Sequence, residues 1–73
     1  MDTVLEQRKQ LLVNDIKYHD QQMVKYERQY SYYFNRNPNL KYLKKLQDNI
    51  KFQQKVRNEF VKQYELEFGK FEL

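Results

Sequence analysis

The sequence contains no cysteine, and only one glycine and one proline among its 73 residues. Without cysteine the chain can form neither a disulfide framework nor a cysteine-ligated zinc site, which are common stabilisers of small folds. A chain of this length makes at most one small domain and buries a comparatively small fraction of its surface. We therefore expect its stability to depend on oligomerisation.

Long apolar runs are also missing. The first residues after Met1 are polar or charged at Asp2, Glu6, Arg8 and Lys9, and no apolar stretch approaches the length of a signal-peptide core or a membrane span. We expect an intracellular, cytoplasmic protein. Seven Tyr and five Phe supply enough apolar surface for the chain to fold rather than remain disordered.

The sequence has no motif of a catalytic or cofactor site. It lacks a glycine-rich phosphate loop, a nucleophile elbow and a His-Glu-x-x-His metal motif. The single histidine, His19, has Asp15 and Asp20 nearby, but on a helix these two carboxylates point away from it. We interpret His19 as a structural residue and expect no enzymatic activity, no cofactor, no metal and no small-molecule substrate.

The single proline and the single glycine divide the chain. Asn37 is a good helix cap, and Pro38 suits the first position of the helix that follows. Gly69 is typical of the residue just past a helix end. The sequence predicts one all-α domain over residues 1–73, with a helix over about 4–34, a loop over about 35–37 and a helix over about 38–68. Two helices of similar length joined by a short loop form an antiparallel hairpin.

Apolar residues recur along both predicted helices with the alternating spacing of four and three residues that a coiled coil has. In the first helix this seam comprises Leu5, Lys9, Leu12, Ile16, His19, Met23, Tyr26, Tyr30 and Tyr33. In the second helix it comprises Leu43, Leu46, Ile50, Gln53, Arg57, Phe60, Tyr64, Glu67 and Phe71, with Phe68 as a substitute for Glu67. Pairing residues whose numbers add to about 73 places the polar exceptions His19, Gln53 and Arg57 in one layer.

A second apolar row lies beside each seam. It comprises Val4, Leu11, Tyr18 and Tyr32 in the first helix, and Tyr42, Phe52, Val56 and Leu66 in the second. One hairpin cannot cover an apolar arc of this width. We therefore expect a homodimer in which two hairpins form a four-helix bundle. The competing interpretation is that the second row docks on a different protein.

Positive charge is concentrated in the middle of the chain, which the hairpin makes its tip. Residues 25–45 carry six basic residues and one acidic residue, Glu27, whereas the rest of the chain has a net charge of −1. Aromatic residues are interleaved with these charges. The predicted partner-binding residues are Arg28, Tyr32, Phe34, Arg36, Lys41, Tyr42, Lys44 and Lys45, whereas Tyr26, Tyr30 and Tyr33 are expected to close the core.

These features predict a regulatory or adaptor protein that binds another macromolecule, in the first place a protein, through the tip or an apolar flank. The absence of alanine and the abundance of Lys, Gln, Asn and Tyr are typical of a low-GC genome, so an inhibitor of a host factor from a phage or mobile element is one such case. The alternative is a dimeric helical bundle that binds RNA or DNA, since aromatic residues stack on bases while basic residues contact phosphates.

Overall fold

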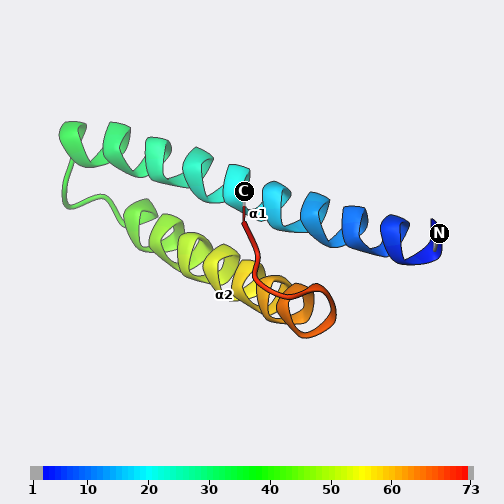
Figure 1. Ribbon diagram of the computed structural model, residues 1–73. Helices are drawn as coiled ribbons and strands as arrows, with labels where there is room; N and C mark the ends of the chain where they lie inside the picture. Colours follow the sequence, from blue (N-terminus) through cyan, green and yellow to red (C-terminus); the bar gives the residue numbers. More distant parts are fainter. Residues whose placement is uncertain (1–2, 73) are drawn as a thin grey trace.

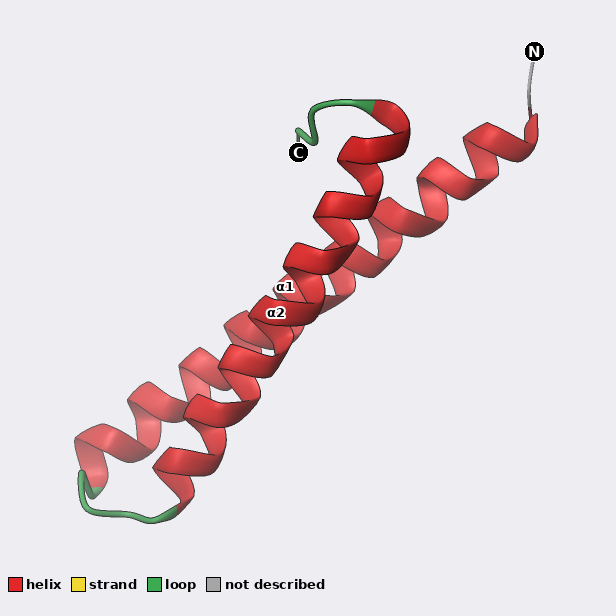
Figure 2. Cartoon of the chain, turned by 90° about the horizontal axis from the view of Figure 1, so that it is seen from below, coloured by secondary structure: helices red, strands yellow, loops and turns green. Residues whose placement is uncertain are grey.

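The computed structural model describes residues 3–72, and it consists of two helices that pack side by side in opposite directions (Figure 1). Helix α1 spans Thr3–Arg36 and helix α2 spans Tyr42–Phe68, and the described residues include no strand. The hairpin is a rod of 55 × 16 × 15 Å. The helices cross near their middle (Figure 2), as expected for a coiled-coil-like pair. Residues 1, 2 and 73 of the predicted domain lie outside the described residues.

The loop spans residues 37–41 rather than 35–37, so the predicted start of the second helix at Pro38 was wrong by four residues. The Asn37 backbone N–H donates to the Tyr33 carbonyl at 2.8 Å and completes α1. The Asn37 side chain accepts the Asn39 N–H at 3.1 Å. Because this carboxamide is used within the loop, it does not cap α2, which begins at Tyr42 with no side-chain cap.

Helix α2 ends at Phe68, as the sequence predicts, because Gly69 adopts a φ of 92° that side-chain-bearing residues rarely take. The Gly69 N–H donates to the Glu65 carbonyl at 3.1 Å. The chain then turns back along the hairpin (Figures 1 and 2). This turn brings the Phe71 ring to 5.1 Å from the Tyr64 ring, in an edge-to-face contact.

The core is a single layer of side chains between the helices. Toward the open end, Leu12, Ile16 and Tyr64 are buried and half-buried neighbours pack around them, namely Val13, Phe60, Val61, Phe68 and Phe71. Toward the tip, Leu43 and Leu46 are buried. The predicted seam thus supplies every buried residue among residues 3–72, whereas its Leu5, Lys9 and Glu67 are exposed.

The register is shifted slightly from the predicted one. Arg8 meets Glu67 and Tyr33 meets Tyr42, whose numbers add to 75, while His19 meets Gln53 at 72 and Asp20 meets Arg57 at 77, so facing residues have numbers that add to about 75. The shift follows from the loop, since α1 continues to Arg36 and α2 starts only at Tyr42. No helix among the described residues is long and apolar enough to cross a membrane.

Candidate functional site

The tip, defined as residues 25–45, contains six basic side chains that have no acidic partner. The ion pairs among residues 3–72 join Arg8 to Glu67, Arg57 to Asp20 and Lys70 to Glu72, all outside the tip. The Arg36 guanidinium lies 4.3 Å from the centre of the Tyr32 ring, in a cation–π contact. This contact holds the charge on the surface without neutralising it, so the tip remains a positively charged end of the rod.

Exposed aromatic side chains border these charges. Tyr32, Phe34 and Tyr42 expose 52%, 46% and 42% of their surface, so the predicted exposure of all three is confirmed. Phe34 stacks on Tyr30 at 5.8 Å, and Tyr42 contacts Tyr33 edge to face at 5.5 Å. Tyr32 contacts Tyr33 edge to face at 5.2 Å, so each exposed ring contacts an aromatic neighbour.

The three tyrosines predicted to close the core are only half-buried. Tyr26, Tyr30 and Tyr33 lie along the seam on α1. The Tyr30 hydroxyl accepts a hydrogen bond from the Gln47 side chain at 3.1 Å, which joins the helices near the tip. The other predicted partner-binding residues are exposed on the surface of the tip: Arg28, Arg36, Lys41, Lys44 and Lys45.

The three residues predicted to form one polar layer, His19, Gln53 and Arg57, divide between two separate pairs. His19 Nδ1 is hydrogen-bonded to the Gln53 side chain, and the imidazole stacks on the Phe60 ring at 5.7 Å. Arg57 Nε donates instead to Asp20 Oδ1 at 2.9 Å. Sequence reasoning missed Asp20, which we expected to point elsewhere.

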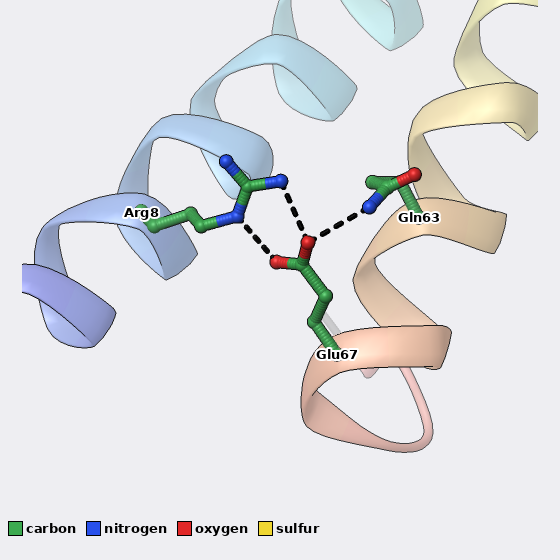
Figure 3. Close-up of polar contacts among 3 residues, drawn as sticks. All are labelled: Arg8, Gln63 and Glu67. Atoms are coloured by element: carbon green, nitrogen blue, oxygen red, sulfur yellow. Dashed lines mark hydrogen bonds and ion pairs between the residues drawn. The ribbon is translucent and has the colours of Figure 1, made fainter.

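A second contact missed from the sequence joins the helices at the open end. The Arg8 guanidinium donates two hydrogen bonds to the Glu67 carboxylate, at 2.5 and 2.6 Å, and Gln63 donates a third at 2.8 Å (Figure 3). These contacts lower the pKa of Glu67, mainly through the Arg8 hydrogen bond, and raise the pKa of Arg8. The arrangement is bidentate and ties α1 to the last turn of α2.

The outer face of α2 carries an open hollow of about 430 Å³. It is lined by Lys51, Gln54, Lys55, Asn58, Glu59 and Lys62. All of these residues come from one helix, so the hollow is a depression between surface side chains rather than an enclosed pocket. Within residues 3–72, no group of three His, Asp or Glu residues is placed to hold a metal ion.

The second apolar row forms an exposed face along one side of the rod. Each of its residues precedes a seam residue by one position, so it is turned about 100° from the seam. Because the helices are antiparallel, this rotation about each helix axis places both rows on the same side of the hairpin. The flank face comprises Leu11, Tyr18, Tyr32, Tyr42, Phe52 and Leu66, which are 64%, 55%, 52%, 42%, 58% and 84% exposed.

The fold and the surface thus define a two-helix antiparallel hairpin with a basic aromatic tip and an apolar flank. The chain matches no protein-family model, and no curated protein or solved structure is significantly similar to it.

Proposed function

We propose that this chain is a small, non-enzymatic regulatory or adaptor protein that binds another protein through its tip. One observation carries the proposal. The six basic side chains of residues 25–45 have no acidic partner, and three aromatic side chains among them are about half exposed. Aromatic and Arg side chains are the residues that contribute most at protein interfaces. An acidic partner surface suits this tip best.

We also propose that the hairpin dimerises into a four-helix bundle. The flank face supports this, because it places six large apolar side chains, 42–84% exposed, along one side of the rod, and large exposed apolar surfaces mark interaction sites. A single layer of side chains between two helices is a small core for a chain of 73 residues. A second layer between two hairpins would stabilise both.

A nucleic-acid binder is the second candidate, and the hollow on α2 favours it. Lys51, Lys55 and Lys62 line this hollow, and none of them takes part in an ion pair among residues 3–72. Free lysines along one helix can contact successive phosphates. However, the chain carries ten acidic residues and a net charge of only +4, which is modest for this class.

The test is a charge reversal of the tip. Replacing Arg36, Lys41 and Lys44 by Glu should abolish capture of the natural partner from the source cell, while the helical spectrum stays unchanged. The matched control reverses Lys9, Lys62 and Lys70, which are also exposed. Loss of binding in the control but not in the tip variant would overturn the proposed tip interface.

A salt titration separates the two candidate partners. Binding to generic RNA or DNA through several phosphate contacts falls steeply between 50 and 200 mM salt, by about 10³-fold or more for six contacts. An aromatic protein interface depends much less on salt. Tight, salt-sensitive binding to nucleic acid that the Lys62-containing reversal removes would favour the second candidate.

A further inference from the structure

We propose that a second copy of this chain covers the flank face, and that the two hairpins lie head to tail, with their tips at opposite ends of the dimer. This inference rests on the dimer proposed above and specifies its surface and orientation. Three properties of the flank face support the inference: its area, its symmetry and its charges.

The area of the flank face is that of an interface. An aromatic side chain has 150–250 Å² of surface, and six large apolar side chains that are 42–84% exposed present roughly 600–700 Å² on each hairpin. A standard interface buries about 800 Å² on each partner. Neighbouring polar side chains on the same face, such as Gln22 and Gln29, bring the face to that size.

The face is also self-complementary, which a two-fold interface between identical chains requires. On α1 the flank face runs from Leu11 to Tyr32, without the Val4 of the same row, and its midpoint lies between Gln21 and Gln22. On α2 it runs from Tyr42 to Leu66, with its midpoint at Gln54. Because facing residues have numbers that add to about 75, these midpoints lie at the same height along the rod.

A two-fold axis that runs perpendicular to the rod at this height places the flank face of one copy against the flank face of the second copy. Each helix then packs antiparallel on its own copy. Leu11 meets Tyr32 of the second copy, and Leu66 meets the second copy's Tyr42. Phe52, nearer the axis, meets Val56 of the second copy. Five of the six flank-face residues thus gain an apolar neighbour, whereas Tyr18 lies opposite Lys25 of the second copy.

A two-fold axis along the rod matches the apolar residues at least as well, since it also places Tyr18 opposite Val56, so the charges decide between the two orientations. That axis places the tips together, although each carries a charge of +5. It also places Asp15 directly opposite Glu59 of the second copy. Both contacts join like charges, which is unfavourable.

The axis across the rod brings opposite charges together instead. Lys25 comes within one helical turn of Asp15 of the second copy, and Lys45 within about one turn of the second copy's Glu59. All four side chains are exposed, and none belongs to an ion pair among residues 3–72. Charge complementarity therefore selects the head-to-tail dimer.

The arrangement divides the tip between two roles. Tyr32 and Tyr42 lie at the dimer interface, which leaves Phe34 as the exposed aromatic residue of the tip. Arg28, Lys41 and Lys44 remain beside it for the protein partner. The dimer then carries two such tips, one at each end.

The first experiment measures the distance between the tips. The chain has no native cysteine, so a spin label at Asn39→Cys in the exposed loop is the only label on each copy. The head-to-tail dimer predicts a label separation of roughly 50 Å, whereas tips at the same end predict a separation below about 20 Å. Sedimentation of the same sample gives the oligomeric state.

The outcomes are distinct. A dimer with the long separation supports the proposed arrangement. A dimer with the short separation overturns the orientation but leaves the proposed dimer standing. A monomer at high micromolar concentration overturns the dimer and this inference together. Reversal of Lys41 and Lys44 without Arg36, which stacks on the interfacial Tyr32, tests partner binding independently.

Cysteine cross-linking tests the axis itself. Gln22→Cys lies beside the proposed axis on the flank face and should form a disulfide with its own copy. Gln21→Cys is the matched control, because it is one residue away and turned a further 100° or so from the seam, so it should not cross-link. Cross-linking of the control alone would contradict the proposed interface.

A charge variant distinguishes the two orientations without a label. In the head-to-tail dimer, Asp15→Lys replaces attraction to Lys25 by repulsion and should weaken dimerisation by about two- to fivefold for each pair. Adding Lys25→Asp should restore it. In the other orientation the single substitution would relieve repulsion from Glu59, so tighter dimerisation of Asp15→Lys would overturn the proposed orientation.

Discussion

Arg8 and Glu67 join the two helices at the open end of the hairpin through a bidentate pair of hydrogen bonds (Figure 3). The two residues are 59 positions apart in the sequence and come from the first and last parts of the helical hairpin. The pair lies in the surface, where ion pairs contribute little to stability. It joins the N-terminal part of α1 to the last turn of α2.

This pair predicts an acid-dependent loss of stability. The hydrogen bond from Arg8 lowers the pKa of Glu67 in the folded state, so the stabilising contribution is fully present above the ordinary value of about 4.5. It is lost as the pH falls through the lowered pKa. Glu67→Gln should therefore reduce the melting temperature slightly at pH 7 and have little effect in strong acid.

Thermal melts of the native chain and of Glu67→Gln over the acid range measure this difference. Glu65→Gln is the matched control, because its side chain is exposed and has no ion pair among residues 3–72. A difference between the native chain and Glu67→Gln that stayed constant down to low pH would contradict the role assigned to the carboxylate.

The polar layer predicts that His19→Leu leaves stability unchanged or raises it. An apolar residue restores the seam at a position where His19 is half-buried against Phe60. The cost is a looser choice of register or oligomer, because the hydrogen bond to Gln53 is lost. Urea unfolding and sedimentation measure the two effects. A loss of more than about 3 kcal/mol would show that the layer is mainly a stabilising network.

We expect the largest losses of stability when either of the two side chains with no exposed surface is truncated. Ile16→Ala and Leu46→Ala should each cost about 2–5 kcal/mol, because each removes buried methyl groups and leaves a cavity. Val24→Ala is the control, since Val24 is 46% exposed and lies on neither the seam nor the flank face. Urea unfolding gives all three values. Equal losses for the control and the buried sites would contradict the assigned core.

We expect any side chain at residue 69, where α2 ends, to reduce the stability of the fold. Gly69→Ala should cost about 1 kcal/mol, because a Cβ atom is strained at a φ of 92° although nothing lies within 4 Å of it. The change should also weaken the contact of Phe71 with Tyr64. Circular dichroism melts measure the loss. Lys70→Ala serves as the control, and an equal effect there would show that the backbone conformation is not responsible.

The regular part of this fold was predictable from the sequence, because the seam depends only on spacing along each helix. All five buried residues belong to it, as do His19 and Gln53. The loop was not predictable in the same way. Asn37 is an equally good helix cap and turn residue, and the structure uses it in the turn.

The side-chain pairs between the helices depend on that loop. A change of two or three residues in the register decides whether Asp20 or His19 lies within reach of Arg57, and the register follows from the loop length. The Arg8 and Glu67 pair has the same origin. The exposure of Tyr32 and Phe34 was predictable, whereas their binding role stays a prediction.

The antiparallel path of the chain also sets the order in which contacts can form. Tyr33 and Tyr42 are nine residues apart, whereas Arg8 and Glu67 are 59 residues apart. Closing a short loop costs less entropy than closing a long one, and local contacts form fastest. Folding should therefore begin beside the tip, and the contacts between the helices should then form one turn after another toward the open end. Amide exchange should follow the reverse order, with the ends of α1 and α2 near Arg8 and Glu67 opening first and the turns around Leu46 last.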